Sequence, residues 1–337
     1  MSRISEKLIV ICGPTGAGKT KLARELCKIF NGEVVNADSR SVYQGMVIGT
    51  SSPTEKERKG IPHHLFNFLK PDQEFSLVQY QKLAQQKIKE IWEKGKIPFL
   101  VGGTGLYLDS VVYNYKIPKG GPNRELRKRL EKENSDKLFK KLQKLDPETA
   151  SIIDKNNKRR LVRALEVYFL TGKPISRQKS KQKLKDDVLY LGIDLPRGKL
   201  YKKIDERTEA MIKRGLVEEV KKLANPSTSL RVGADPFDNT QGHPELKSMD
   251  ERSRSAKKYS STLSSMSAVG YQEIGDYLCR RITLKKAIEK IKYRSHALAR
   301  RQLTWFRKNK DIKWLITESE AKKLIKKFLK IPRWPSG

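Results

Sequence analysis

The chain has 337 residues, and its 72 lysines and arginines against 38 aspartates and glutamates give a formal net charge of +34. This charge favours a polyanionic partner, and the length allows two or three domains. The sequence has no apolar run of about eighteen residues, which excludes a membrane-spanning helix. Its first residues, MSRISEKLIVICG, lack the features of a signal peptide, so we expect a cytoplasmic protein.

The first expected elements are a buried strand and a helix joined by a glycine-rich loop. The run Leu8 to Thr20, LIVICGPTGAGKT, has the GxxxxGKT spacing of a phosphate-binding loop. Its glycines allow successive N–H groups to converge on phosphate oxygens, Lys19 adds a charge, and the Thr20 hydroxyl can bind Mg²⁺. The candidate phosphate-binding residues are Gly13, Pro14, Thr15, Gly16, Ala17, Gly18, Lys19 and Thr20. The loop indicates a phosphate or diphosphate without selecting ATP.

The second expected strand, Glu33 to Ala37, ends in a carboxylate that can face this loop. Asp38 follows the strand directly and precedes Arg40 by two residues. A carboxylate beside a phosphate site is suited to take a proton from an incoming nucleophile. The alternatives are that Asp38 caps a turn or binds a metal ion through water.

A third strand departs from the usual pattern of nucleotide-hydrolysing enzymes. The pattern predicts a helix over Ser76 to Lys94, capped by Ser76, and then a strand over Ile97 to Val101. That strand ends in GGTG, residues 102–105, where phosphoryl-transfer enzymes of this class usually have an acidic Mg²⁺ ligand. The alternation of strands and helices predicts an α/β fold with a parallel sheet.

The composition then changes to charged, nearly glycine-free sequence of helical character. We expect a helical insertion domain over residues 119–187, between the core segments 1–118 and 188–337. One face of its helix is basic, with Lys158, Arg159, Arg160 and Arg163 opposite an apolar face. Such a face is either simply solvated or contacts phosphates, and the charge of the whole chain favours phosphate contacts.

The second core segment is expected to contain one strand and two long helices. The strand spans Val188 to Leu195, and the first helix, Leu200 to Leu223, has Arg207 near its middle. The second helix, Thr283 to Lys308, ends in RSHALARRQLTWFRK, where Trp305 lies among basic residues. This mixture suits stacking on RNA, and packing of the helix on the sheet is the alternative for the tryptophan.

Two remaining features carry no expected catalytic residue. Residues 225–261 are rich in Ser, Pro, Asp and Gly, which predicts a disordered insert. Cys12, Cys27 and Cys279 have neither disulfide nor zinc-site spacing. We therefore expect reduced cysteines, as in a cytoplasmic protein.

Eight segments in chain order resemble the tRNA dimethylallyltransferases. They are GPTGAGKT, NADSRSVYQGM, PHHLFN, GGTGLYLDSVV, RRLVRALEVYFLTGKPIS, ERTEAMIKRGLVEEV, SAVGYQEIGDYL and RRQLTWFRK. The resemblance covers nearly the whole chain, and no zinc-finger extension follows, as in the bacterial form. It implies a P-loop NTPase-like parallel sheet core with a helical insertion domain. It also implies a monomer that transfers the dimethylallyl group of dimethylallyl diphosphate to N6 of adenosine at tRNA position 37, releasing diphosphate with Mg²⁺.

The resemblance further implies catalytic roles. The implied catalytic residues are Asp38, Thr104 and Arg207. Asp38 would take the proton from N6, Arg207 would neutralise the leaving diphosphate together with Lys19 and Thr20, and Thr104 would help to hold a substrate. Thr20 would be the Mg²⁺ ligand. One of the adjacent residues His63 and His64 would order the donor site, and on a strand their side chains would point to opposite faces.

A further set of residues is implied to contact tRNA. The set is Asp38, Ser39, Arg40, Ser41, Thr104, Arg127, Asn157, Lys158, Arg159, Arg160, Leu161, Ala268, Val269, Gly270, Tyr271 and Gln272. Its first members would read the everted adenine, residues 157–161 would bind the anticodon stem, and residues 267–272 would line the acceptor side. Family members often have a basic residue just before and another after the VGY segment. This chain has Ala268 and Gln272 there.

Three other functions remain open from the sequence. A small-molecule phosphotransferase would transfer phosphate from ATP, and it leaves the net charge and the missing acidic residue unexplained. A relative that prenylates free adenine nucleotides would not need the basic insertion. An RNA-binding nucleotide switch without catalysis would leave Asp38 without a chemical task.

Overall fold

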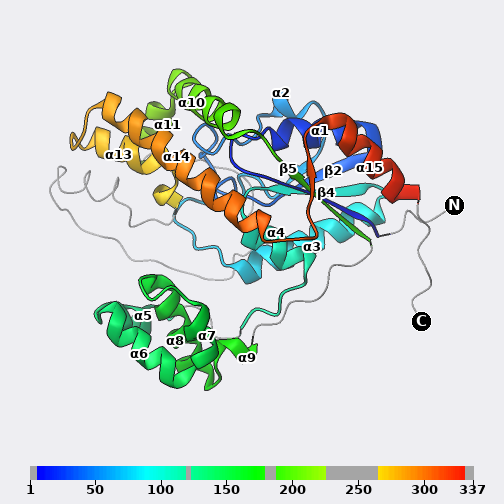
Figure 1. Cartoon of the computed structure of the whole chain (residues 1–337). Coiled ribbons are helices and arrows are strands. Elements are labelled where there is room, and N and C mark those ends of the chain that lie inside the picture. The colour runs from blue at the N-terminus through cyan, green and yellow to red at the C-terminus, as the bar shows by residue number, and fades with distance from the viewer. Residues whose placement is uncertain (1–5, 119–122, 179–186, 225–264, 331–337) are drawn as a thin grey trace, which may run out of the picture. The chain divides into compact units, whose positions relative to one another are not determined.

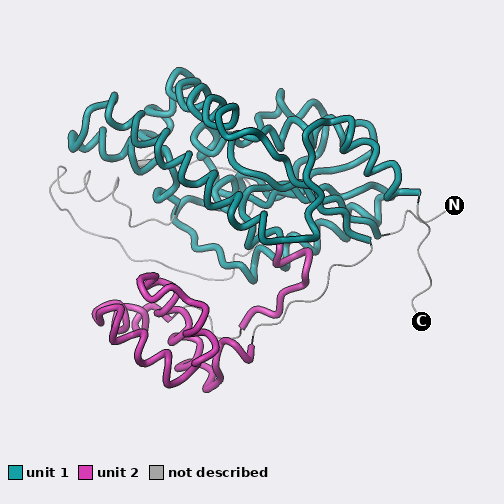
Figure 2. Tube along the Cα trace, in the orientation of Figure 1, with its two compact units in different colours: residues 1–108, 186–337 teal, residues 109–185 magenta. Residues whose placement is uncertain are grey.

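The computed structural model describes residues 6–118, 123–178, 187–224 and 265–330. It divides into two compact units, residues 1–108 with 186–337 and residues 109–185 (Figure 2). The predicted insert at residues 225–261 lies outside the described residues. Among the described residues, no helix combines the length and the apolar character that crossing a membrane requires.

The first unit is built on a parallel sheet of six strands in the order β3-β2-β4-β1-β5-β6 (Figure 1). The strands are β1 (Leu8–Cys12), β2 (Gly32–Asn36), β3 (His63–His64), β4 (Ile97–Gly102), β5 (Val188–Ile193) and β6 (Lys313–Leu315). Every residue of β1, β2 and β4 is buried, as expected for parallel strands covered on both faces. The predicted α/β fold with a parallel sheet is confirmed.

Helices connect these strands and extend the unit beyond the sheet. They are α1 (Lys19–Phe30), α2 (Glu55–Arg58), α3 (Leu77–Glu93), α4 (Gly105–Val112), α10 (Arg197–Lys213), α11 (Leu216–Ala224), α13 (Tyr271–Leu278), α14 (Leu284–Arg307) and α15 (Glu318–Lys330). The predicted cap of α3 is confirmed, because the Ser76 side chain accepts from the Gln79 N–H and Gln79 contacts the Ser76 N–H in return. One apolar core lies against the sheet, around Ile9 and Phe99, and a second one lies around Met46 and Tyr271.

The single helix predicted over Leu200 to Leu223 is wrong. The structure has two helices there, α10 and α11, which are separated at Gly215. Gly215 has a φ of +95°, a conformation that glycine adopts without steric cost and that ends α10. The apolar residues of α10 and α11 keep helical spacing on both sides of Gly215, so the hydrophobic periodicity alone does not reveal the break.

The second unit is a small helical bundle. It contains α5 (Arg124–Glu131), α6 (Ser135–Leu145), α7 (Pro147–Ile152), α8 (Lys158–Thr171) and α9 (Ile175–Gln178), around a core that includes Leu138, Leu142, Leu161 and Leu165. The unit begins at residue 109, inside α4, whereas the composition change placed the start at 119. Composition marks the first charged helix and misses the segment that connects it to the sheet.

Candidate active site

The phosphate-binding loop follows β1 and ends where α1 begins at Lys19. Gly13, Gly16 and Gly18 all have positive φ, at +148°, +81° and +91°. Gly16 also lies against α10, since a Cβ there would be 2.8 Å from Cγ1 of Ile204. The glycine spacing is therefore explained by backbone conformation and by close packing under the loop.

Lys19 folds back over this loop. Its Nζ donates to the carbonyl oxygens of Gly13, at 3.0 Å, and Pro14, at 2.8 Å. The pKa of Lys19 is lowered to about 8, mainly because of burial; Asp38 opposes this shift and Arg207 adds to it. The ammonium group thus lies at the loop in a site that favours an anionic ligand.

Arg207, from the middle of α10, reaches the same loop. Its Nη1 donates to Oγ1 of Thr15 at 2.8 Å, and its Nε is buried without a hydrogen-bond partner among the described residues. Burial lowers the pKa of Arg207, and the negative charge of Asp38 opposes that shift. A buried guanidinium with an unused donor indicates that an anion binds here.

Gln302, on α14, joins the phosphate-binding loop to the end of β4. Its Oε1 accepts from the N–H of Thr15 at 2.8 Å, and its Nε2 donates to the carbonyl oxygen of Gly103 at 2.9 Å. The sequence interpretation missed this residue, although it lies within the segment RRQLTWFRK. The sequence signal for Gln302 is an amide side chain, which can both donate and accept hydrogen bonds, within a segment of mostly cationic side chains.

Asp38 and Thr104 meet where β2 and β4 end. The Thr104 N–H donates to the carbonyl of Ala37 at 3.1 Å, and its Oγ1 accepts from the Ser39 N–H at 3.0 Å. Asp38 is half-buried, and its Oδ1 accepts from the N–H of Arg40 at 2.9 Å. The turn that Asp38 caps therefore holds its carboxylate beside the phosphate-binding loop, at the edge of one cavity.

That cavity has a volume of about 480 Å³, the size of a small-molecule site. Thr15, Lys19, Thr20, Asp38, Arg40 and Arg207 are among the polar residues that line this cavity. Apolar side chains on α10 and α14 also line it, namely Met211, Ile204, Ile291 and Leu298. The arrangement can bind a molecule with an anionic head and a short apolar tail, beside a carboxylate.

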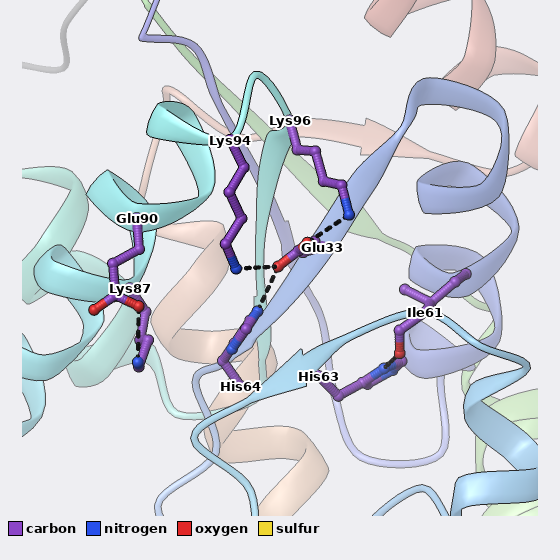
Figure 3. Close-up of polar contacts among 8 residues, drawn as sticks. All are labelled: Glu33, Ile61, His63, His64, Lys87, Glu90, Lys94 and Lys96. Atoms are coloured by element: carbon purple, nitrogen blue, oxygen red, sulfur yellow. Dashed lines mark hydrogen bonds and ion pairs between the residues drawn. The ribbon is translucent and has the colours of Figure 1, made fainter.

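The two adjacent histidines point in different directions, as predicted for neighbours on a strand. His64 contacts the buried carboxylate of Glu33 at 2.7 Å, and Lys96 contacts the same carboxylate at 2.7 Å (Figure 3). His63 lines the cavity, and its Nδ1 lies 2.8 Å from the carbonyl oxygen of Ile61 (Figure 3). Burial lowers the pKa of His63, which favours the neutral ring. His63 is therefore the histidine of the pair that belongs to the site.

The second unit presents a basic surface, and part of the predicted set is internal to it. Asn157 caps α8 through the N–H of Arg160, and Arg159 and Arg160 are exposed. Leu161, however, is fully buried in the bundle core, so its side chain is not at the surface. The tRNA contact of Leu161 stays a prediction, and its side chain lies in the bundle core.

Arg127 is also bound within the second unit. Its Nε and Nη2 donate to the two carboxylate oxygens of Glu166, at 2.7 and 3.0 Å, and Arg163 adds a third contact at 2.8 Å. Burial alone would raise the pKa of Glu166, but these hydrogen bonds lower it overall. Arg127 therefore neutralises a buried carboxylate that joins α5 to α8.

The VGY segment of the first unit is mostly buried. Ala268 and Gly270 lie in the interior, Tyr271 is fully buried, and Val269 and Gln272 are half-buried. Ala268 and Val269 also line the cavity. The hydroxyl of Tyr271 donates to Glu219 at 2.6 Å inside the protein, and the tRNA contact of this residue stays a prediction.

The aromatic residues at the end of α14 pack within the protein, as in the second of the two alternatives predicted for the tryptophan. Phe306 is fully buried, whereas Trp305 is 37% exposed and packs on Gly105. A Cβ on Gly105 would lie 2.3 Å from Cδ1 of Trp305, so the glycine is needed for this contact. The tryptophan anchors α14 against the end of β4, while Arg300 and Arg301 are exposed.

The described residues contain no group of three or more His, Cys, Asp or Glu side chains arranged to hold a metal ion. Thr20 is exposed and lines the cavity at the start of α1. A hydroxyl at that place fits Mg²⁺, which commonly takes one or two protein oxygens and completes its coordination with phosphate oxygens and water. All three cysteines are free, and Cys12 and Cys27 are buried.

The fold and the site define the class of α/β proteins with a P-loop NTPase-like core, here with a carboxylate and a threonine near the glycine-rich loop. The family model for IPP transferases matches residues 41–309. The tRNA dimethylallyltransferase of Pelotomaculum thermopropionicum is 38% identical over 94% of this chain and 92% of its own. The tRNA dimethylallyltransferase of a Roseiflexus species is 42% identical over 89% of this chain and 90% of its own.

Solved structures agree with these sequence relatives. The tRNA isopentenylpyrophosphate transferase of Bacillus halodurans has a TM-score of 0.65 and 35% identity over 97% of both chains. A eukaryotic dimethylallyltransferase acting on tRNA has a TM-score of 0.74 and 28% identity over 95% of this chain and 78% of its own. This chain belongs to the IPP transferase family.

Proposed function

We propose that this chain is a tRNA dimethylallyltransferase. It transfers the dimethylallyl group of dimethylallyl diphosphate to N6 of adenosine 37 in tRNA and releases diphosphate. The bond between C1 of the donor and the diphosphate oxygen breaks, a bond between C1 and N6 forms, and N6 loses a proton. The observation that carries this proposal is one cavity in which Asp38 lies with the phosphate-binding loop and Arg207. The family membership supports the same reaction.

The cationic end of the cavity stabilises the leaving diphosphate. Arg207 has a buried Nε without a partner among the described residues, and Lys19 donates only to loop carbonyls. A diphosphate would supply acceptors for both. Because negative charge grows on the diphosphate as the C1–O bond breaks, these donors contribute more in the transition state than in the ground state.

Asp38 acts as the general base at the other reacting atom. Its carboxylate is held through the Arg40 N–H, and Thr104 fixes the adjacent Ser39. An exocyclic amine is a weak nucleophile, so orientation by this turn and removal of the proton both assist attack. The target adenine reaches the cavity after it has left its stack in the anticodon loop.

Mg²⁺ fits the diphosphate end, where the Thr20 hydroxyl would hold it. When bound, the ion would neutralise part of the diphosphate charge. This limited protein contribution agrees with the absence of an acidic residue in GGTG, residues 102–105, at the end of β4. No phosphoryl group is transferred, so the metal needs fewer protein ligands than in a kinase.

The tRNA contacts follow from the exposed and half-buried members of the predicted set. Ser39 and Arg40 read the everted adenine and its neighbours, and Asn157 to Arg160 bind the anticodon stem. Val269 and Gln272 line the acceptor side. The protein acts on tRNA in the cytoplasm as a monomer, and its net charge of +34 supports binding of the polyanion.

The first test is incubation with unmodified tRNA, Mg²⁺ and dimethylallyl diphosphate, followed by mass spectrometry of the nucleosides. We expect a C5 adduct on adenosine 37, and Asp38→Ala should lower its rate by about 10²- to 10⁴-fold because the general base is lost. Asp72→Ala, at an exposed site that does not line the cavity, is the matched control. Phosphate transfer from ATP to a small molecule, without any adduct, would reject the proposal.

A further inference from the structure

Glu219, on α11, accepts hydrogen bonds from three consecutive backbone N–H groups. Its carboxylate oxygens lie 3.0 Å from the N–H nitrogen of Val47, 2.7 Å from that of Ile48 and 3.1 Å from that of Gly49. Three converging amides form a concave anion site of the kind that often binds phosphate. Here a side chain from 170 to 172 positions further along the chain fills it.

Tyr271 completes this arrangement from α13. Its hydroxyl donates to Oε1 of Glu219 at 2.6 Å, and its fully buried ring lies against Gly49. A Cβ on Gly49 would be 2.4 Å from the ring, so only glycine allows this packing. Burial and the Glu219 carboxylate raise the pKa of Tyr271, which therefore remains a proton donor. One carboxylate thus has four donors around it.

The backbone that Glu219 binds leads directly into the cavity wall. Gly49, Thr50, Ser51 and Pro53 line the cavity that also contains the phosphate-binding loop. Glu219 itself is not among the residues that line the cavity. It contacts the backbone within residues 47–53, which we name the wall loop, and this contact is a route by which it can act on a bound substrate.

The wall loop has little regular structure to hold it in place. Its turn includes Ser51 at a φ of +53°, a conformation that is costly for serine, and a hydrogen bond of 2.9 Å joins the hydroxyls of Thr50 and Ser52. Hydrogen bonds to an ionised carboxylate are stronger than those between neutral groups. The contacts with Glu219 therefore add to the hydrogen bonds within the loop, such as that from the Ser52 N–H to the carbonyl oxygen of Val47 at 3.0 Å.

We propose that Glu219 is a positioning residue for the donor, because it fixes the wall loop in the shape that binds dimethylallyl diphosphate. This inference rests on the proposed function. The donor is the substrate concerned because the wall loop and the phosphate-binding loop share one cavity of small-molecule size. Loss of the carboxylate lets the wall loop move, and the donor must then order it on binding.

The test compares Glu219→Gln with wild type under steady-state conditions, with the full-length protein. We expect the KM for dimethylallyl diphosphate, at saturating tRNA, to rise about tenfold, while kcat and the KM for tRNA change less than about twofold. Glu218→Gln is the matched control, since Glu218 is the preceding residue, is exposed and pairs with Lys221 on the same helix. It should behave like wild type.

Tyr271→Phe is the second variant, in case Glu219→Gln fails to fold. It removes one of the four hydrogen bonds to Glu219, and the donor KM should rise by about two- to threefold. A lower melting temperature and a smaller active fraction with unchanged KM would show a merely structural role and overturn the inference. A rise confined to the KM for tRNA, or equal behaviour of Glu219→Gln and Glu218→Gln, would also overturn it. If the wild-type protein shows no prenyl transfer in the same assay, the proposed function itself is rejected.

Discussion

In the proposed donor site, Lys19 is the residue whose pKa is lowered to about 8. Burial lowers its pKa from 10.5 to about 8, while Asp38 acts in the opposite direction. The folded protein therefore binds fewer protons at Lys19 than the unfolded chain between these two values. Its contribution to stability becomes more favourable as the pH rises through that interval, so loss of activity there does not arise from unfolding caused by this group.

The charge on Lys19 gives the first pH prediction. We expect kcat/KM for dimethylallyl diphosphate to fall above about pH 8, because the free enzyme then loses the cation that binds the donor. The decline in kcat should begin at higher pH, since a bound diphosphate stabilises the ammonium form. Rate measurements from about pH 6 to 10 test this. In Lys19→Arg the guanidinium keeps its charge, and an unshifted decline in that variant would contradict the assignment.

Single residues also show how burial changes an interpretation. Tyr271 and Leu161 lie in segments that resemble tRNA-binding motifs, but both side chains are fully buried. Arg127 is exposed in part and is bound by Glu166. A sequence motif does not distinguish surface residues from buried ones. The tertiary structure decides whether a residue faces a ligand or packs behind the residues that face it.

At the scale of elements, the segment after β4 shows why its glycines are necessary. A Cβ on Gly102 would lie 2.1 Å from the carbonyl oxygen of Ala37, and a Cβ on Gly103 would lie 2.5 Å from Nε2 of Gln302. These approaches bring the ends of β2 and β4 together with α14. Asp38, Thr104 and Gln302 can therefore meet near the phosphate-binding loop only because this segment lacks side chains.

Replacement of Gly102 tests this requirement. Gly102→Ala should lower the free energy of unfolding by about 2–3 kcal/mol or more, because the new methyl group has no space beside β2. Gly198→Ala is the matched control, since a Cβ there has no neighbour within 4 Å and its φ is not positive. That change should be neutral or stabilising by up to about 1 kcal/mol. Urea denaturation of both variants measures the difference, and equal midpoints would contradict the packing argument.

At the scale of the whole molecule, the chain is strongly basic and each of its two units has apolar core residues of its own. The first unit contains the cavity, and the second unit is a bundle with its own core and a basic surface. Because phosphate contacts release counterions, affinity for tRNA should fall steeply with salt. We expect the affinity for the donor to depend instead on the cavity in the first unit.

Neutralising exposed arginines of α8 tests this division. Arg159→Gln with Arg160→Gln should reduce the slope of log K against log salt for tRNA by about one per lost phosphate contact. The KM for dimethylallyl diphosphate should remain unchanged. Lys322→Gln, on α15 of the first unit and paired with Glu318, is the control. Filter binding at several salt concentrations gives the slopes, and slopes equal to wild type would mean that these arginines are only solvated.

The sequence by itself determined the features that arise from neighbouring residues. The GxxxxGKT spacing sets the turn of the phosphate-binding loop, Ser76 and Gln79 cap α3, and apolar runs define the parallel strands. Such features depend on backbone geometry and hydrogen bonds within a few residues. The break at Gly215 was missed, since periodicity does not report backbone conformation.

Only the tertiary structure decided which distant residues form the site. Arg207 contacts Thr15 across 192 positions of the chain, and Gln302 contacts Thr15 across 287. It also placed His63 in the cavity and His64 against Glu33. These pairings depend on how helices pack on the sheet, and the energy of that packing is shared among many buried side chains rather than encoded in any local pattern.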